Sequence, residues 1–374
     1  MNKNLNSQSE FIPIYEPFMD EEEKRLVNEA LDSGWISSKG IFVERFEQEF
    51  SRRIGLPEAT VCTNGTVALD LALMAMGIGP GDEVIVPDFS YIATANAVVH
   101  VGATPVFCDV NIDTWQLEPT NVATRINTKT KAVIAVHTYG GVTSIADLRK
   151  VTDSANLKII EDCAEAIGSL DKGAHVGVAG DVATFSFFGN KTITTGEGGM
   201  VASSDDQVMS MVRRLKNQGV AEGHRYVHDI LAYNYRMTNL ACAIGCAQMG
   251  KLDAILIKKK LLWERYLKEL ASTPLIPQSF ELNTQSSHWL CAFRLCSDTS
   301  STELIYHMSE SGIDTRPGFG VISDMPMYQH LKKYTHAPNS RQLADTVICL
   351  PSYPGLTEEQ QGKVINSVRS FFGS

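Results

Sequence analysis

Short apolar runs rich in β-branched residues alternate with helical stretches from residue 59 to about residue 204, and this alternation constrains the fold more than any other feature. Each run is apolar at consecutive positions, so both faces of the strand that it forms must be buried. The clearest runs lie at 83–86, 104–107, 132–136 and 157–160, and two further strands are expected at 184–188 and 200–203. Buried strands separated by helices indicate an α/β fold with a mostly parallel central sheet flanked by helices.

The length of 374 residues suggests two domains. Asp20 and, three residues later, Glu23 form a capping-box pattern that predicts the start of a helix. A long helical pattern covers 251–270. We therefore expect a large domain over 1–250, with an N-terminal arm, and then a linking helix and a smaller C-terminal α+β domain over 251–374.

The overall composition excludes several partners. With 33 basic and 43 acidic residues the net charge is −10, whereas a nucleic-acid binder needs clustered lysine and arginine. The eight cysteines are scattered without a Cys-x-x-Cys pair, which is typical of buried, reduced thiols rather than of disulfides or a metal site. The N-terminus is polar and no apolar stretch reaches about 18 residues. We expect a cytoplasmic protein that binds neither nucleic acid nor membrane.

A possible phosphate-binding turn lies at Thr63-Asn64-Gly65-Thr66, directly before an apolar helical stretch over 67–76. Gly-Thr at the start of a helix offers free backbone N–H groups, a hydroxyl and the positive end of the helix dipole, and all three suit a phosphate. The same residues could also form an ordinary helix cap.

Two ionisable side chains stand at strand ends. Asp162, after Glu161, closes a predicted strand, and the carboxyl end of a parallel strand faces the crevice where α/β folds bind ligands. An acid there could keep a heterocyclic nitrogen protonated, or it could cap a helix over 163–166. Lys191 follows the strand at 184–188, where partial desolvation would lower the pKa of its amine and make it nucleophilic. A merely exposed lysine is the alternative.

The glycine-rich stretches do not form a dinucleotide fingerprint. A strand follows Gly196-Glu197-Gly198-Gly199, where that fingerprint needs a helix. A phosphate cradle, a strand-end acid and a lysine, in this order along one sheet, describe a site for pyridoxal 5'-phosphate instead. In such a site the lysine holds the aldehyde as a Schiff base, the acid pairs with the pyridinium nitrogen, and backbone amides hold the phosphate.

At these residues the chain resembles the DegT/DnrJ/EryC1/StrS sugar aminotransferases, which have fold type I among the pyridoxal phosphate enzymes. The resemblance runs from Gly34-Trp35-Ile36-Ser37 to Leu350-Pro351-Ser352. Within the family, the segments 161–168 and 186–200 are most similar to the GDP-perosamine synthases, which move an amino group from L-glutamate to carbon 4 of GDP-4-keto-6-deoxymannose. The resemblance implies a transaminase in surface polysaccharide or lipopolysaccharide biosynthesis.

The resemblance also implies roles for individual residues. Lys191 would be the Schiff-base lysine, and Asp162 would pair with the pyridinium nitrogen. The other cofactor contacts would come from Gly65, Thr66 and Ser186 at the phosphate, Glu165 near the phenolic oxygen, Tyr91 stacked on the ring, and Asn234, which would reach the phosphate from the neighbouring subunit. Family members are accordingly homodimers with shared active sites.

One segment departs from the perosamine type. Those relatives carry Arg-Pro-x-Phe-Tyr-Pro-x-His near the sugar site, but this sequence has Gly320 in the tyrosine slot and Ser323 in the histidine slot. Losing two large or ionisable groups changes the shape and hydrogen bonding of a pocket. Arg316 is retained and could pair with a phosphate or a carboxylate. An unactivated keto sugar acid, 8-oxo-Kdo, therefore stays open as the acceptor beside the GDP-sugar.

The expected reaction is a ping-pong transamination. Glutamate would displace Lys191 from the cofactor, and the freed amine would shuttle the proton between substrate carbon and cofactor carbon. After 2-oxoglutarate leaves, the same steps in reverse would aminate the keto sugar. A dehydratase on this fold has a histidine in place of the lysine, and Lys191 argues against that class. A catalytically silent regulator that binds the cofactor is a further alternative, which half-reaction spectra with glutamate would distinguish.

Overall fold

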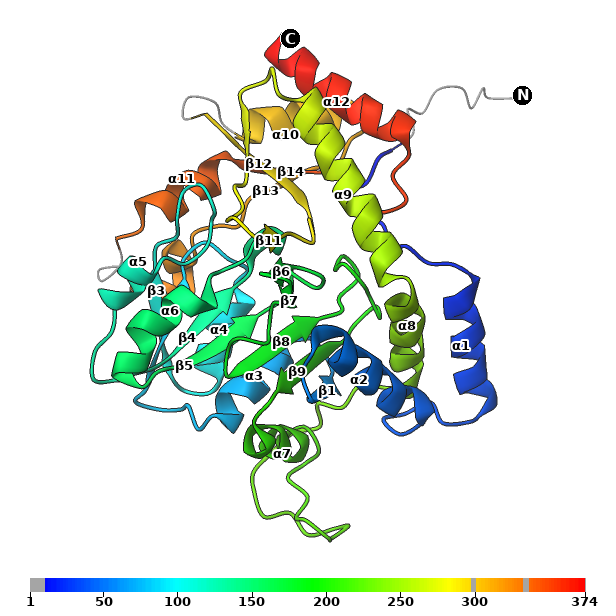
Figure 1. The fold of residues 1–374 in the computed structure, drawn as a ribbon, viewed down its shortest axis with the longest axis vertical. Coiled ribbons are helices and arrows are strands. Elements are labelled where there is room, and N and C mark those ends of the chain that lie inside the picture. Colours follow the sequence, from blue (N-terminus) through cyan, green and yellow to red (C-terminus); the bar gives the residue numbers. More distant parts are fainter. Residues whose placement is uncertain (1–10, 297–300, 332–335, 374) are drawn as a thin grey trace.

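A seven-stranded sheet forms the centre of the computed structural model, which describes residues 11–296, 301–331 and 336–373 (Figure 1). The strand order is β1-β9-β8-β5-β4-β2-β3, and β9 runs antiparallel to both of its neighbours in an otherwise parallel sheet. The strands are β1 (Glu58–Cys62), β2 (Glu83–Pro87), β3 (Thr104–Cys108), β4 (Thr130–Val136), β5 (Lys158–Asp162), β8 (Val182–Ser186) and β9 (Gly199–Ser203). The predicted α/β fold with a mostly parallel sheet is confirmed.

Helices cover both faces of this sheet, as strands that are apolar at consecutive positions require (Figure 1). One face carries α3 (Gly65–Ala75), α4 (Ala93–His100) and α7 (Asp206–Leu215). The other face carries α2 (Ile41–Ile54), α6 (Ile145–Thr152) and α8 (Asn239–Gly250). The short helix α5 (Pro119–Ala123) lies beside α6. The carboxyl ends of the parallel strands stay open between these layers.

The predicted helix after Asp20 is α1 (Glu21–Asp32), which packs against α8. Its capping box is present: the Asp20 carboxylate accepts the Glu22 amide at 2.8 Å, and Glu23 accepts the Asp20 amide at 2.9 Å. Strand β1 was not among the expected strands. It joins the sheet through β9, a long-range pairing that leaves no periodic signal in five residues.

A second, smaller sheet in the order β10-β12-β14-β13 lies beyond the large one (Figure 1). Its strands are β10 (Leu275–Pro277), β12 (Cys291–Leu295), β14 (Val347–Leu350) and β13 (Arg316–Pro317). The helices around it are α9 (Leu252–Glu269), α10 (Ser301–Glu310), α11 (Pro338–Thr346) and α12 (Glu358–Phe372). A three-stranded ribbon joins β11 (Thr284–Gln285), β6 (Leu170–Asp171) and β7 (Ala174–His175). The C-terminal residues thus form the expected α+β arrangement after a long helix.

The N-terminal arm packs against this second sheet region. The Ile12 amide donates to the Gly312 carbonyl at 2.9 Å, and the Asp314 amide donates to the Ile12 carbonyl at 2.8 Å. The domain boundary at residue 250 stays a prediction. If it holds, an arm that the sequence places with the large domain contacts the small one.

Among the described residues, no single helix is long and apolar enough to cross a membrane. Helices α8 and α9 reach that length and composition only as a pair, and the chain bends by 62° between them.

Candidate active site

A cavity of about 1010 Å³ opens at the carboxyl ends of the central strands. The last residues of β4, β5 and β8, which are Val136, Asp162 and Ser186, all line it. Eight residues that the sequence singled out are among its lining: Gly65, Thr66, Tyr91, Asp162, Glu165, Ser186, Lys191 and Arg316. The crevice at the strand ends is therefore where the predicted site residues meet.

The predicted phosphate cradle is the N-terminus of α3. Asn64 caps the helix by accepting the Val67 amide at 2.9 Å, so the expected cap and the free helix end coexist. Gly65 lies so close to β8 that a Cβ in its place would meet the Ser186 Cβ at 2.7 Å. The amides of Gly65 and Thr66 and the Ser186 hydroxyl thus share one small space, which suits an anion.

Asp162 is buried at the end of β5 and is held by two hydrogen bonds. Its carboxylate accepts the Ala164 amide and the Thr94 hydroxyl, each at 3.1 Å. The alternative of a helix cap is wrong, because residues 163–166 form turns. Burial raises the pKa of Asp162, and the hydrogen bonds and the nearby Lys191 oppose that rise. The carboxyl group is therefore fixed in direction and faces the cavity.

Lys191 stands half-buried in the cavity wall beside Asp162 and Glu165. Burial lowers the pKa of its amine, while the two carboxyl groups oppose that shift. The alternative, an exposed surface lysine, is wrong, because the Lys191 side chain is partly buried. Its Nζ lies 4.1 Å from the ring centre of Trp289, and its carbonyl accepts the Tyr15 hydroxyl at 2.7 Å.

Glu165 is buried against the loop after β4. Its carboxylate accepts the Tyr139 amide at 2.7 Å. Burial raises the pKa of Glu165 to about 7, against the opposing effects of Lys191 and that hydrogen bond. A carboxyl group of this kind can donate a proton near neutral pH as well as accept one.

Aromatic side chains form part of the cavity wall. Phe319 stacks on Tyr139 at 4.9 Å between ring centres, and Tyr139 stacks on Trp289 at 5.8 Å. Tyr91 is 58% exposed and lies 6.2 Å from Phe319 between ring centres. The guanidinium of Arg316 lines the same cavity, and within the described part of the chain it makes no hydrogen bond or ion pair.

Gly320 and Ser323, which depart from the perosamine pattern, do not line this cavity. Ser323 is fully buried and bonded to Asp88. From this segment, only Arg316, Pro317 and Phe319 reach the cavity. Neither of these two residues contacts the cavity of its own chain, so the structure gives no support to the expectation that they reshape the pocket directly.

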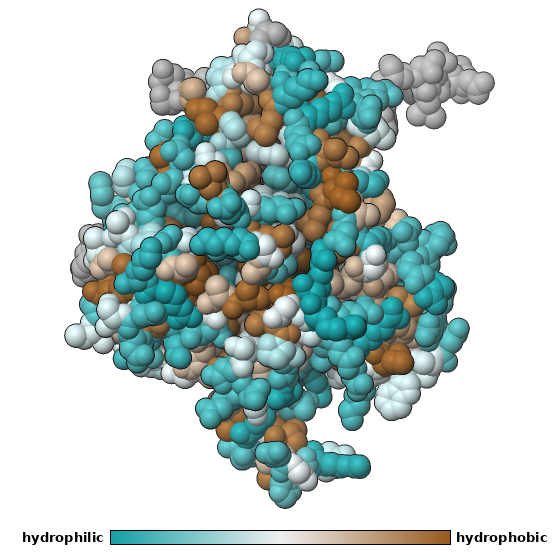
Figure 2. All heavy atoms as spheres, viewed as in Figure 1, coloured by the Kyte–Doolittle hydropathy of each residue, from teal (hydrophilic) through white to brown (hydrophobic). Residues whose placement is uncertain are grey.

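Asn234 does not line the cavity, although its neighbours Tyr233 and Tyr235 do. It is exposed, and its side chain accepts a hydrogen bond from Arg236 Nε at 2.9 Å. The segment that contains it, between α7 and α8, projects from the molecule, and apolar side chains gather on it (Figures 1 and 2). Tyr226 and Leu231 in this segment are 90% and 92% exposed. A contribution of Asn234 to the site of another subunit stays a prediction.

Sequence reasoning missed four residues that contact the predicted ones. Tyr15 and Trp289 contact Lys191, Thr94 bonds Asp162, and Tyr139 bonds Glu165. Thr94 stands three residues after Tyr91, which was among the predicted residues, so its position could have suggested a role. Tyr15 is 176 residues from Lys191, and no local pattern marks such a partner.

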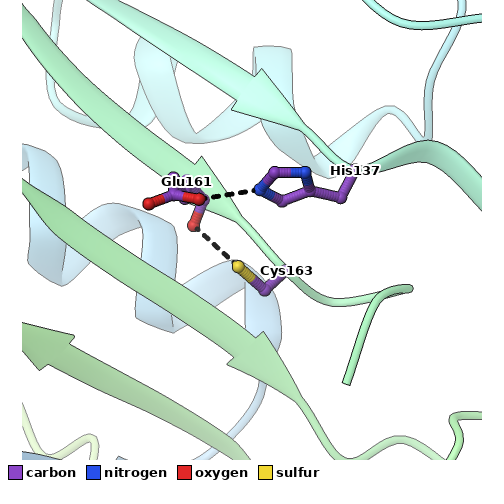
Figure 3. A group of neighbouring side chains, drawn as sticks. All are labelled: His137, Glu161 and Cys163. Atoms are coloured by element: carbon purple, nitrogen blue, oxygen red, sulfur yellow. Dashed lines mark hydrogen bonds and ion pairs between the residues drawn. The ribbon is translucent and has the colours of Figure 1, made fainter. Parts of the chain in front are cut away.

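A buried cluster of His137, Glu161 and Cys163 has the composition of a metal site (Figure 3). Glu161 is already satisfied, because it accepts His137 Nε2–H at 2.9 Å and the amides of Gly177 and Ala179. His137 Nδ1 accepts the Thr143 amide at 3.1 Å, so both ring nitrogens are engaged. Burial raises the pKa of the Cys163 thiol well above its ordinary value. These hydrogen bonds give the cluster a packing role.

Fold and cavity together define a class of protein, the fold type I aminotransferases. The structure of the putative sugar aminotransferase Spr1654 from Streptococcus pneumoniae, in its PMP form, matches this one with a TM-score of 0.91. The match covers 97% of this chain and 98% of that chain at 27% sequence identity.

The sequence narrows the class to one family. The model of the DegT/DnrJ/EryC1/StrS aminotransferase family matches residues 17–369. The GDP-perosamine synthase of Vibrio cholerae is 46% identical, covering 96% of this chain and 99% of that protein. The one of Escherichia coli O157:H7 is 42% identical, covering 97% and 99%. The chain belongs to the DegT/DnrJ/EryC1/StrS aminotransferase family, and it is a pyridoxal phosphate-dependent sugar aminotransferase.

The residues of the cavity fit this cofactor. Two buried oxygens that line it, Ser90 Oγ and Asn190 Oδ1, have no hydrogen-bond partner among the described residues. The amides of Gly65 and Thr66 point out of the first turn of α3, where a helix leaves N–H groups unpaired. A phosphate and a ring with polar substituents would supply partners for both sets.

Proposed function

We propose that this enzyme transfers the amino group of L-glutamate to carbon 4 of GDP-4-keto-6-deoxymannose, in the synthesis of a surface polysaccharide. The observation that carries the proposal is the similarity to GDP-perosamine synthases at 46% and 42% identity over nearly the whole chain. The structure adds support, because Gly320 and Ser323, which depart from those relatives, do not line the cavity, whereas the retained Arg316 does.

In this proposal Lys191 holds the cofactor through Nζ and then acts as the proton carrier. When bound, pyridoxal phosphate withdraws electrons from the substrate carbon that loses a proton. Burial favours the neutral form of the Lys191 amine, which can accept that proton. Trp289 and Tyr15 keep the lysine beside the cavity, so the proton is returned within the same site.

Asp162 and Arg316 bind the charged ends of the reactants. Asp162 is fixed by Thr94 and the Ala164 amide, so its carboxylate is directed at a protonated ring nitrogen without rearrangement. The guanidinium of Arg316, which has no hydrogen-bond or ion-pair partner among the described residues, suits a phosphate of the nucleotide sugar or the carboxylate of glutamate. Gly65, Thr66 and Ser186 bind the phosphate of the cofactor at the start of α3.

A substrate panel tests the acceptor. The purified holoenzyme is incubated with glutamate and one of three acceptors: GDP-4-keto-6-deoxymannose, another nucleotide-linked keto sugar, or 8-oxo-Kdo. All three reactions are compared by kcat/KM, and we expect a high value, with formation of 2-oxoglutarate and an amino sugar, only for the GDP-sugar. Preferred amination of 8-oxo-Kdo would replace the proposed acceptor, and Arg316 would then bind the carboxylate of that sugar acid.

Borohydride reduction tests the lysine. Reduction of the holoenzyme followed by peptide mapping should place the cofactor on Lys191. Lys259 is the internal control, because burial lowers its pKa to about 8 and it does not line the cavity. Label on Lys259, or an unlabelled Lys191→Ala variant that still aminates a keto sugar, would contradict the assignment.

We also propose a homodimer in which Asn234 completes the site of the partner. Its exposed position outside the cavity of its own chain and the exposed Tyr226 and Leu231 support this. Lys191→Ala and Asn234→Ala are mixed after each has been shown to be impaired alone. If Asn234 acts across the interface, mixed dimers contain one intact site and activity returns. No recovery in mixed dimers identified by native mass spectrometry would place Asn234 in the site of its own chain.

A further inference from the structure

A buried carboxylate joins the end of β2 to the segment that follows β13. Asp88, directly after β2, accepts the Ser323 amide on one oxygen and the Ser323 hydroxyl on the other, each at 2.7 Å. The Asp88 carbonyl also accepts the Ile322 amide at 3.0 Å. Asp88 and Ser323 are both fully buried. These three hydrogen bonds fix residues 321–323 to the large sheet.

The two chain segments joined here both carry residues of the cavity wall. Tyr91 lies three residues after Asp88, and Phe319 lies four residues before Ser323. Their ring centres are 6.2 Å apart, and both line the cavity together with Arg316. A shift of residues 321–323 would therefore change the spacing between Tyr91 and the wall that contains Phe319 and Arg316.

The same chemistry occurs at the neighbouring strand. Asp109, directly after β3, accepts the Ser340 amide at 2.8 Å and the Ser340 hydroxyl at 2.6 Å on one oxygen, and its other oxygen accepts the Asn339 amide at 3.1 Å. Ser340 is fully buried in the first turn of α11. Neither Asp109 nor Ser340 lines the cavity. The protein thus contains two buried aspartate–serine contacts, of which the one at Asp88 is next to the cavity wall.

We propose that Asp88 and Ser323 are positioning residues that set the width of the cavity between Tyr91 and Arg316, and so the binding of the amino donor and the keto acceptor. This inference rests on the proposed function in that it takes the cavity as the active site. Ser323 then links two segments through its hydrogen bonds to Asp88, and it does not replace a residue that contacts the substrate. A histidine in its slot would need space that this fully buried position does not have.

Removing the Ser323 hydroxyl leaves one oxygen of Asp88 buried without its donor, which is unfavourable enough to displace a chain segment. A displacement of about 1 Å in residues that position a substrate is enough to weaken its binding or slow its reaction. The effect should appear in KM, because Asp88 and Ser323 do not touch the reacting atoms.

The test compares Ser323→Ala with Ser340→Ala in the holoenzyme. Both variants lose one buried hydroxyl bonded to an aspartate, but in Ser340→Ala each oxygen of Asp109 keeps an amide donor, so its Tm should fall no more than that of Ser323→Ala. The glutamate half-reaction is followed by the absorbance of the cofactor. KM here is the glutamate concentration at half-maximal rate of that half-reaction, and kcat is its limiting rate. For Ser323→Ala we expect KM for glutamate to rise about tenfold with kcat within about threefold, and for Ser340→Ala both constants to stay within about twofold. Equal KM values in the two variants would overturn the proposal.

A second variant covers the case in which Ser323→Ala does not fold. Asp88→Asn keeps one oxygen acceptor and offers an N–H to Ser323 Oγ, so it should retain KM within about threefold, whereas Asp88→Ala should raise it as Ser323→Ala does. A high KM in Asp88→Asn equal to that of Asp88→Ala would contradict a positioning role. Failure of the acceptor assignment is separate, because it leaves the glutamate half-reaction of the wild type intact. A wild type without that half-reaction would overturn both.

Discussion

Two glutamates four residues apart show how local hydrogen bonds decide the charge of a buried carboxyl group. Burial acts to raise the pKa of Glu161, yet its hydrogen bonds from His137 and from backbone amides outweigh burial and lower that pKa. Glu165 has one amide donor, and burial raises its pKa to about 7. Hydrogen-bond donors and the electrostatic attraction of His137, rather than the depth of burial, separate a fixed anion from a group that exchanges protons near neutral pH.

Glu165→Gln should remove a dependence of stability on pH. The unfolded Glu165 loses its proton near pH 4.3 and the folded one near 7, so between these values the folded state binds the extra proton and the free energy of unfolding falls as pH rises. The full effect is on the order of 3 kcal/mol. Urea unfolding of the cofactor-free protein at about pH 5 and about pH 8 measures it. We expect the wild type to lose more stability than Glu165→Gln; parallel losses would contradict this.

Gly65→Ala should weaken cofactor binding without a long-range change. The added Cβ would lie 2.7 Å from the Ser186 Cβ, so the first turn of α3 must move away from β8. Overpacking of this kind costs about 1–3 kcal/mol, and if the bound state bears that cost the affinity for pyridoxal phosphate falls by roughly fivefold to a hundredfold. Gly189→Ala is the matched control, because a Cβ there meets no atom within 4 Å. Fluorescence titration of the cofactor-free variants measures both.

The site could be predicted from sequence where a residue stands at a defined point of a local element. Asp162 ends a strand, Gly65 starts a helix, and Lys191 follows a strand, and all three line the cavity. Tyr15 and Trp289 could not be predicted in this way. They are brought to Lys191 and Asn190 across 176 and 99 residues by packing between elements, which no short pattern encodes.

At the scale of elements, the start of α8 organises the loop before α2. Asn239 accepts the Phe42 amide at 3.0 Å and donates to the Trp35 carbonyl at 2.7 Å. A Cβ at Gly40 would overlap the Asn239 side chain, and Gly40 has φ of 149°. The end of one helix thus determines where another begins, about 200 residues earlier in the chain.

Asn239→Ala should destabilise the fold by about 2–3 kcal/mol, because one buried side chain serves both an amide and a carbonyl that would be left unpaired. Thr238→Ala is the control: it removes only the exposed N-cap of α8, worth about 1 kcal/mol. Urea midpoints at a common pH compare the two variants. Equal losses would show that the Asn239 contacts with the loop add nothing to an ordinary cap.

The fold was predictable from sequence to the extent that each element buries a continuous apolar run. Strands β2 to β5 meet that condition on both faces. Strand β1 has no sequence pattern that predicts it, because its position at the edge of the sheet depends on pairing with β9. The link between Asp88 and Ser323 depends on tertiary packing for the same reason, since it connects residues 235 positions apart.

On the scale of the whole molecule, Lys259 marks the meeting point of three parts. It lies on α9, its Nζ donates to the Ser352 carbonyl at 2.9 Å, and it stands 5.2 Å from the ring centre of Tyr15 in the N-terminal arm. Tyr15 in turn bonds the Lys191 carbonyl. A fully buried lysine therefore connects the long helix, the arm and the C-terminal segment behind the cavity.

Lys259→Met should change how stability depends on alkaline pH. Burial lowers the pKa of Lys259 to about 8, whereas the unfolded side chain titrates near 10.4. Between these values the unfolded state binds more protons, so the wild type gains stability as pH rises, by on the order of 3 kcal/mol in full. The variant lacks this gain. Unfolding curves at about pH 7 and about pH 10 give the change in the free energy of unfolding for each protein. The same change in the wild type and in Lys259→Met would contradict the prediction.

The stack that ends at Lys191 also has an optical consequence. Of the four tryptophans, Trp289 lines the cavity, with its indole ring 4.1 Å from Lys191 Nζ. Trp35 is 58% exposed, Trp115 packs against Phe89 and Tyr139, and Trp263 stacks on His288 and Phe293. The emission of indole overlaps the absorbance of pyridoxal phosphate, so a cofactor at Lys191 would quench Trp289 by energy transfer. The protein thus contains its own fluorescent reporter, and the loading of each site can be followed without any added label.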